Sequence, residues 1–126
     1  MKKTILAGLL LLASTSNADI IKCSFAEPFV DTTYSMSQST LTYVAEGETK
    51  VIKNVSFQIR APGVFELVRN GKVLQKLKLT NQGSTGSSNT IYPYEVQDSS
   101  LRETVTANNG IGGCVSNSLK SSEGQP

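Results

Sequence analysis

Two cysteines, Cys23 and Cys114, carry the plainest chemistry in this chain of 126 residues. In an oxidising compartment an even pair of cysteines usually forms a disulfide, so the pair predicts a Cys23–Cys114 bond rather than two free thiols. Such a bond would close a loop of about 90 residues and stabilise the fold by at most about 4–5 kcal/mol. The cysteines are not spaced as C-x-x-C, so a thiol–disulfide exchange site is not expected.

The residue types that most enzymes need are missing. The chain has no histidine, which excludes Ser-His-Asp and Cys-His nucleophilic sites and histidine-bearing zinc sites. No dinucleotide fingerprint occurs, and the segment Gly83-Ser84-Thr85-Gly86 lacks the lysine that a P-loop requires. We therefore expect no cofactor, no metal site and no catalytic residue.

Carboxylates are the remaining candidates for catalysis, because two acids alone can hydrolyse a glycoside. The acids considered for such a pair are Glu27, Asp31, Glu46, Glu48, Glu66, Glu95, Asp98 and Glu103. Nothing in their spacing marks two of them as partners. A small carboxylate-based hydrolase is therefore a third hypothesis, behind two binding functions.

The first eighteen residues predict where the protein works. A basic start, Met1-Lys2-Lys3, precedes an apolar run from Ile5 to Ala13 and a small-residue site, Ser16-Asn17-Ala18. This layout is typical of a secretory signal peptide, so we expect cleavage after Ala18 and a periplasmic or secreted protein. The apolar run is shorter than the roughly 20 residues of a membrane span, and the mature protein is expected to contain none.

Charge restricts the partners of the mature protein. The chain has 12 Lys and Arg against 10 Asp and Glu, and two of the lysines lie in the predicted leader. The mature form is therefore close to neutral. Nucleic-acid binding needs a strong basic field to neutralise phosphates, so it is not expected.

Apolar residues recur mostly with period two, which predicts β-strands. Ile21, Cys23 and Phe25 alternate with polar neighbours, and the stretch 51–60 predicts one longer strand. No helical stripe is evident. We expect an all-β fold, either a small antiparallel β-sandwich or a closed β-barrel, with one disulfide. The predicted domain covers residues 19–115, followed by a polar C-terminal tail over 116–126.

A β-hairpin is predicted over residues 64–79. Asn70-Gly71 is the preferred pair for a two-residue type I′ turn, which would place Leu67 opposite Leu74. The face assigned to the core consists of Val64, Val68, Val73, Leu77 and Leu79. Glu66 and Gln75 would then lie opposite one another, either hydrogen-bonded together or facing a ligand.

Beyond the hairpin, residues 80–90 predict a polar loop and 98–113 an irregular stretch. A short strand is expected from Ile91 to Val96. Because Pro93 cannot donate to a ladder, this strand is expected at a sheet edge or with a bulge.

Two surfaces are candidates for binding. The favoured one joins Ser88, Tyr92 and Tyr94 to the polar loop before them, unless the two tyrosines instead close the core. The alternative is the presumed outer face of the hairpin, an apolar centre with a basic rim. Its residues are Phe65, Leu67, Arg69, Lys72, Leu74 and Lys76. Another strand or loop covering the apolar part is the competing interpretation.

The pentapeptide Ser88-Asn89-Thr90-Ile91-Tyr92 resembles the Ser-Gly-x-x-Tyr loop of the periplasmic inhibitors of c-type lysozyme, with Asn in place of Gly. That resemblance implies a small secreted β-barrel whose loop enters the lysozyme cleft. The second motif of those inhibitors, Tyr-x-x-x-Thr-Lys-Gly, has no counterpart in this chain.

Together these observations predict a non-catalytic binding module for a protein or an envelope polymer. Inhibition of a cell-wall-degrading enzyme such as c-type lysozyme is the alternative function.

Overall fold

The computed structural model describes residues 20–26, 29–86, 89–101 and 110–116. The predicted leader over residues 1–18, Ser88, Glu27 and Glu103 lie outside the described residues. Within the described part, no helix has the length and apolar character needed to cross a membrane.

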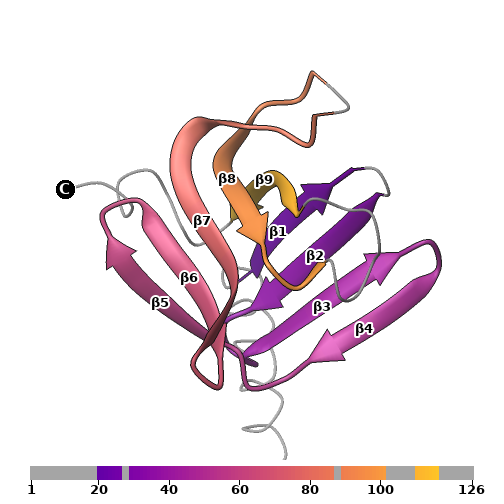
Figure 1. The fold of residues 1–126 in the computed structure, drawn as a ribbon, viewed down its shortest axis with the longest axis vertical. Helices are drawn as coiled ribbons and strands as arrows, with labels where there is room; N and C mark the ends of the chain where they lie inside the picture. Colours follow the sequence, from indigo (N-terminus) through magenta and orange to yellow (C-terminus); the bar gives the residue numbers. More distant parts are fainter. Residues whose placement is uncertain (1–19, 27–28, 87–88, 102–109, 117–126) are drawn as a thin grey trace, which may run out of the picture.

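The described residues form nine β-strands in one antiparallel sheet, which confirms the all-β class (Figure 1). The strands are β1 (Ile20–Phe25), β2 (Val30–Ser35), β3 (Thr40–Ala45), β4 (Glu48–Ile52), β5 (Ser56–Ala61), β6 (Val64–Arg69), β7 (Lys72–Gly83), β8 (Tyr92–Asp98) and β9 (Ile111–Ser116). Their order in the sheet is β4-β3-β2-β1-β9-β8-β7-β6-β5.

This order is a meander that is interrupted once. Consecutive strands pair with each other except β4 and β5, and the first strand pairs with the last. Because all the pairings are antiparallel, β4 and β5 run in the same direction, although they follow each other in the chain. They lie at the two edges of the sheet and do not pair, so the sheet is not closed.

The predicted disulfide is confirmed. Cys23 on β1 lies directly opposite Cys114 on β9, with their Cα atoms 4.0 Å apart. Closely spaced pairs of this kind occur at the non-hydrogen-bonded positions of antiparallel strands. The bond therefore joins the first and last strands at the middle of their ladder.

The predicted turn at Asn70-Gly71 is confirmed, with positive φ values of 54° and 79°. The register beyond the turn is different from the prediction. Val68 lies opposite Val73 as expected, but Leu67 lies opposite Gln75, because Leu74 is an extra residue on β7. On one side of such a bulge, each side chain of the strand points to the face opposite to the one that regular alternation predicts.

The assignment of the hairpin's core face was right only in part. Leu77 is in the core as predicted, but the core residues of β6 are Phe65 and Leu67, at 1% and 0% exposure. Val68 is buried outside the main core cluster, and Val64 is only half-buried. Both faces of β6 carry apolar side chains, so alternation alone could not identify the inner one. Glu66 lies opposite Lys76 rather than Gln75.

The single strand predicted over 51–60 is in fact two strands. β4 ends at Ile52 and β5 begins at Ser56, with Asn54 at a φ of 63° between them. Val55 beside this bend is fully buried. The chain therefore leaves one edge of the sheet and enters the other within three residues.

The edge position predicted for the strand of Pro93 was also wrong, since β8 lies between β7 and β9. The alternative expectation was a bulge on this strand; the extra residues lie instead on its partner β7, between Leu79 and Gly83, opposite Tyr94 and Tyr92. At Gly83 a Cβ atom would lie 2.1 Å from the Tyr94 carbonyl oxygen. Only glycine allows this close approach.

β9 begins within the stretch 98–113 that was predicted as irregular, and it extends to Ser116. The hydrophobic pattern did not reveal this strand, because Gly112 and Gly113 have no side chain that could show an alternation of apolar and polar residues. A Cβ atom on Gly112 would lie 2.2 Å from the carbonyl oxygen of Ser24. One on Gly113 would lie 2.4 Å from Cδ1 of Tyr92. The glycines thus let β9 fit between its neighbours, where a larger residue would clash.

Candidate functional site

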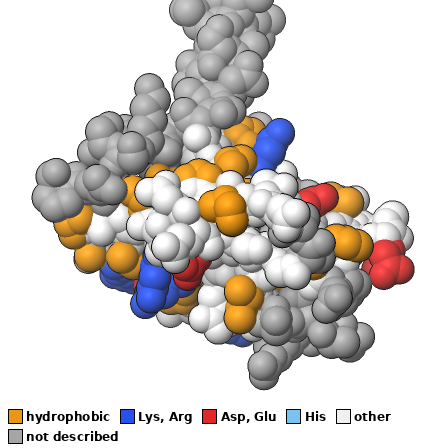
Figure 2. Space-filling model, turned by 90° about the horizontal axis from the view of Figure 1, so that it is seen from above, with side chains coloured by type: hydrophobic (Ala, Val, Ile, Leu, Met, Phe, Trp, Pro, Cys, Tyr) orange, Lys and Arg blue, Asp and Glu red, His pale blue; other side chains and the backbone are white. Residues whose placement is uncertain are grey.

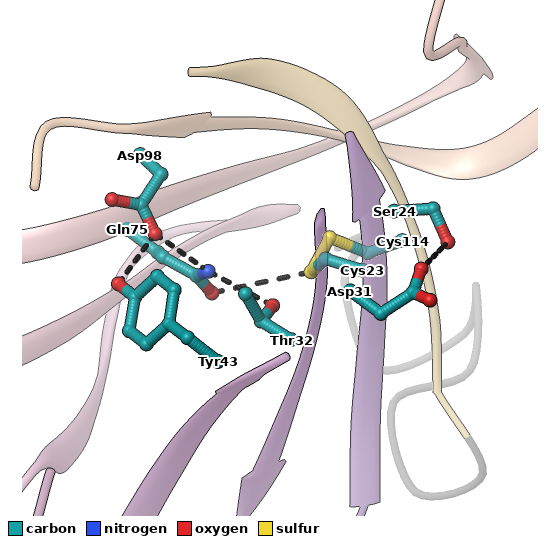
Figure 3. The surroundings of a disulfide bond; sticks show 8 residues. All are labelled: Cys23, Ser24, Asp31, Thr32, Tyr43, Gln75, Asp98 and Cys114. Carbon is teal, nitrogen blue, oxygen red and sulfur yellow. Dashed lines mark hydrogen bonds between the residues drawn. A yellow bond between two sulfur atoms is a disulfide. The ribbon is translucent and has the colours of Figure 1, made fainter. Parts of the chain in front are cut away.

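A buried polar network crosses the interior between two distant parts of the sheet (Figure 3). Tyr43 on β3 donates its hydroxyl proton to Oδ2 of Asp98 on β8 at 2.6 Å. Gln75 Nε2 on β7 donates to the same Asp98 oxygen at 2.9 Å and to Thr32 Oγ1 on β2 at 3.1 Å. β2 and β3 are far from β7 and β8 in the sheet order, so these contacts show that the sheet folds over onto itself.

Asp98 is the centre of this network. It is 3% exposed, and its second oxygen accepts bonds from the backbone amide and the hydroxyl of Ser100, at 2.8 and 2.7 Å. Its four donors among the described residues are therefore neutral groups. A buried carboxylate is tolerated where several donors satisfy it, and this one accepts four hydrogen bonds.

Burial, and then the neighbouring Asp98 carboxylate, raises the pKa of Tyr43 well above its ordinary value of 10.0. Tyr43 therefore remains a protonated donor at neutral pH. Its hydroxyl oxygen also lies 2.7 Å from Ser100 Oγ. The arrangement suits a structural clamp between the two parts of the sheet.

The network reaches the disulfide through Gln75. Its Oε1 lies 3.9 Å from Cys23 Sγ, the contact drawn from Gln75 to the sulfur in Figure 3. A disulfide sulfur carries no proton, so we regard this as a van der Waals contact rather than a hydrogen bond. The disulfide and the network thus form one continuous buried layer.

A groove opens where the interior of the sheet reaches solvent, between β4 and the turn of the β6–β7 hairpin. We call it the basic groove; it has a volume of about 340 Å³ and is lined by Lys50, Ile52, Arg69, Asn70, Lys72, Leu74 and Ser100. Three of these side chains are cationic. Among the residues that the structure describes, none that lines the groove is a carboxylate.

Strand geometry explains why these cations converge. Lys50 lies opposite Tyr43 and therefore shares its inward face, at a position where edge strand β4 is exposed. Arg69 and Lys72 face each other across the Asn70-Gly71 turn. The bulge at Leu74 turns Lys72 toward the interior, whereas a regular strand would place it on the same face as Lys76.

Arg69 is held in place by a hydrogen bond from its Nε to the carbonyl oxygen of Lys53, at 2.9 Å. A guanidinium has five N–H donors, so four remain on its two terminal nitrogens. Ser100, at the base of the groove, is 6% exposed and connects the groove to Asp98 and Tyr43.

A second groove of about 220 Å³ lies on the outer face of the sheet. We call it the outer groove; it is lined by Lys76, Lys78, Glu95, Val96, Gln97 and Ile111. Lys78 lies opposite Glu95 on neighbouring strands. The acid offsets one of the two lysines, so the described lining of this groove carries one net positive charge.

The hairpin surface predicted from the sequence is not one patch. Phe65 and Leu67, its presumed apolar centre, are in the core. The other members divide between two grooves: Arg69, Lys72 and Leu74 line the basic groove, while Lys76 lines the outer groove. The bulge on β7 separates them. A binding role for these residues stays a prediction.

The predicted tyrosine site is also divided. Tyr94 is 1% exposed, and its ring meets that of Phe65 edge-on at 5.9 Å, which places it in the core. Tyr92 is half-buried and lies over Gly113. Ser88 lies outside the described residues. The binding of a partner by Tyr92 stays a prediction.

Sequence reasoning missed Lys50 and the Tyr43–Asp98 contact. No pattern among neighbouring residues indicates either of them. Lys50 becomes part of the groove only because the hairpin turn at Asn70, distant in sequence, lies across from it. The contact joins residues 55 positions apart.

The carboxylates considered for hydrolysis do not gather in the described part of the chain. Glu66 pairs with Arg60 at 2.6 Å, and Asp31 accepts a bond from Ser24 at 3.0 Å. Asp98 is enclosed in its network. No group of three or more His, Cys, Asp and Glu among the described residues could hold a metal ion.

Exposed apolar side chains are dispersed. On the face that Figure 2 shows, orange side chains form several separate spots among white atoms and a few charged side chains. The large ones are Phe29, Val44, Val51, Ile59, Ile91, Ile111 and Val115. We therefore take the basic groove, where three cations converge, as the candidate site.

No protein-family model, curated protein or solved structure matches this chain. The residues of the site are therefore the basis for assigning a function.

Proposed function

We propose that the protein is a non-catalytic binding module that recognises a protein or an envelope polymer through the basic groove. The observation that carries the proposal is the convergence of Lys50, Arg69 and Lys72 on one groove. Ligand sites are often found at the mouth of a rolled sheet, where a rigid framework holds polar groups around a concave space. Ile52 and Leu74 add apolar walls.

The proposed place of action is the periplasm or the medium, after removal of residues 1–18. The leader pattern supports export, and the Cys23–Cys114 bond is consistent with an oxidising compartment outside the cytoplasm. The intact mass of exported protein should correspond to a chain that begins at Asp19. Full-length protein recovered from the cytosol would contradict this proposal.

For the finer architecture, we propose an incompletely closed barrel. The hydrogen bond between Tyr43 on β3 and Asp98 on β8 supports it, because it spans the interior between strands remote in the sheet. A crystal structure in which β4 and β5 diverge into two flat packed sheets would favour a sandwich instead.

The binding proposal can be tested with exported protein and three separate probes: purified peptidoglycan, an anionic envelope glycan and c-type lysozyme. A double variant, Lys50→Gln with Lys72→Gln, should lose binding to whichever probe binds the wild type. The matched control is Lys76→Gln with Lys78→Gln, which removes the same charge from the outer groove and should retain binding. Equal losses in both double variants would contradict recognition by the basic groove.

Inhibition of a cell-wall-degrading enzyme is the second candidate. The described residues of the connection from β7 to β8 project beyond the body of the sheet (Figure 1), and Ile91 at the end of this connection is 63% exposed. A projecting segment with an exposed apolar side chain suits insertion into an enzyme cleft. Ile91→Ser should relieve inhibition of c-type lysozyme, whereas Ile111→Ser on the outer face should not. Wild-type protein that leaves lysozyme fully active would refute this candidate.

A further inference from the structure

Three exposed asparagines of the described chain have a left-handed backbone. They are Asn54, Asn70 and Asn81, with φ values of 63°, 54° and 58°. Asparagine is a chemically labile residue, because its side-chain amide can react with the backbone nitrogen of the next residue. Whether that nitrogen is engaged or open therefore decides which of the three is reactive.

The backbone nitrogens after the first and the third of these asparagines are engaged. Val55 N donates to the Ser39 carbonyl oxygen at 2.9 Å. Gln82 N donates to Thr80 Oγ1 at 3.1 Å. Each of the two residues also has a side chain that hinders approach to its nitrogen, so reaction is disfavoured at both places.

The nitrogen after Asn70 is open. Among the described residues, neither the Asn70 side-chain amide nor the Gly71 nitrogen has a hydrogen-bond partner. Apart from its chain neighbours, no heavy atom lies within 4 Å of the position that a Cβ of Gly71 would take. Arg69 precedes the pair, and its guanidinium stabilises the negative charge that the Gly71 amide acquires when it loses its proton.

The reaction that this arrangement permits is deamidation through a cyclic imide. The deprotonated Gly71 nitrogen attacks the side-chain carbonyl carbon of Asn70, a new N–C bond forms, and the side-chain nitrogen leaves as ammonia. Water then opens the ring. Attack of water on the side-chain carbon gives aspartate, and attack on the main-chain carbon gives isoaspartate. The sequence consumes one water, releases one ammonia and needs no oxidant or cofactor.

We propose that Asn70 is a site of spontaneous deamidation and that this modification weakens recognition of anionic ligands by the basic groove. Asn70 lines that groove, whose described lining contains no carboxylate. Either product adds one, so the charge of the groove falls by one whatever its starting value. The effect on recognition rests on the proposed function, whereas the modification itself does not.

The modification is tested by incubating exported protein in mildly alkaline buffer, folded or unfolded in urea, and following each asparagine by peptide mass spectrometry. In the folded protein Asn70 should be converted faster than Asn54 and Asn81. Because local opening of an exposed turn costs little, folding should slow the conversion of Asn70 by no more than about tenfold. A stronger suppression, or conversion no faster than at Asn81, would overturn the proposal.

Two variants isolate the effect on recognition, with the anionic envelope glycan as the probe. Asn70→Asp reproduces one product, and Asn70→Gly cannot deamidate; Asp-Gly and Gly-Gly both fit the type I′ turn. Asn70→Asp should bind the glycan about tenfold more weakly than Asn70→Gly, the scale of one charge-assisted interaction. Incubation should weaken binding by wild type but leave Asn70→Gly unchanged.

The two proposals fail in different ways. If Asn70 keeps its amide while the Lys50→Gln, Lys72→Gln protein loses its probe, the modification is refuted and the proposed function stands. If Asn70 is converted but Asn70→Asp and Asn70→Gly bind the glycan equally, the effect on recognition is refuted. If no probe binds wild type, the proposed function fails and recognition fails with it, while the mass measurement still decides the modification.

Discussion

Two junctions connect the strands β1–β4 with the strands β5–β9, and they are built differently. At the first, β1 meets β9 in a continuous ladder that the Cys23–Cys114 disulfide crosses. We call it the closed seam. At the second, β4 and β5 approach without pairing, and we call it the open seam. Isolated hydrogen bonds attach Val55, in the β4–β5 connection, to neighbouring elements: Tyr34 Oη on β2 donates to the Val55 carbonyl oxygen at 2.8 Å, and Val55 N donates to the Ser39 carbonyl oxygen at 2.9 Å.

Strand direction explains the difference. Strands β1 and β9 run in opposite directions and can share a ladder, whereas β4 and β5 run the same way and are joined by only three residues. A parallel pair needs a crossover of a dozen residues or more, so this connection cannot form one. The open seam therefore leaves the interior accessible. There the chain places Lys50, Arg69 and Lys72 instead of backbone pairing.

Breaking the closed seam should have the largest effect on stability. Replacing both Cys23 and Cys114 by Ala should lower the free energy of unfolding by about 2–5 kcal/mol, because the unfolded chain gains the freedom of a long loop. Urea denaturation of the variant and of wild type, each with and without reductant, measures the effect. An unchanged midpoint in the variant would show that the ladder alone holds the seam.

Asp98→Asn tests the network that spans the interior beside the open seam. The amide would place a donor where four donors now point, so the free energy of unfolding should fall by about 3 kcal/mol. Glu95→Gln, an exposed position on the same strand, should change it by less than about 0.5 kcal/mol. If the two variants have similar urea midpoints, the network does not stabilise the fold.

Tyr43→Phe should have a smaller effect, about 1–2 kcal/mol near neutral pH, since one donor to Asp98 is lost. Its effect should also depend on pH. Because the pKa of Tyr43 is raised above 10.0 in the folded protein, the unfolded chain loses that proton first. Wild-type stability should therefore decrease as pH rises above about 10, the ordinary tyrosine pKa, toward the higher folded-state value.

The comparison is made by urea denaturation of wild type and Tyr43→Phe at pH 8 and at pH 11. The advantage of wild type should be smaller at the higher pH. A constant difference between the two proteins would contradict the raised pKa of Tyr43.

Changes in the basic groove should have the smallest effect on stability. Lys50→Gln should alter the free energy of unfolding by less than about 0.5 kcal/mol, because an exposed cation on an edge strand contributes little to folding. Thermal denaturation of wild type and Lys50→Gln measures this effect. A large loss of stability would mean that Lys50 is part of the scaffold, and the contrast between the seams would disappear.

Features with a local cause were predictable from the sequence. The inward alternation of Ile21, Cys23 and Phe25 and the Asn70-Gly71 turn depend on neighbouring residues, and both are present. The disulfide was predictable because the chain has only two cysteines.

Features that depend on distant residues were not predictable. The inner face of β6 is set by the packing of Phe65 against Phe57 and Tyr94, at centroid distances of 5.3 and 5.9 Å. The bulge at Leu74 leaves no mark in the hydrophobic pattern, yet it moves Lys72 into the basic groove. β9 was hidden because Gly112 and Gly113 are selected by close backbone approach rather than by burial of a side chain.

The pairing of β1 with β9 has a consequence for how the chain acquires its shape. It is the one contact between described strands that must wait for both ends of the domain, because the other ladders join strands adjacent in sequence. A circular permutant, cut between Lys53 and Val55 and linked from β9 to β1, would run β5-β6-β7-β8-β9-β1-β2-β3-β4. Every strand would then lie beside its neighbour in the chain. The mean sequence separation of contacts would fall, and such a permutant should fold faster than the natural order of strands.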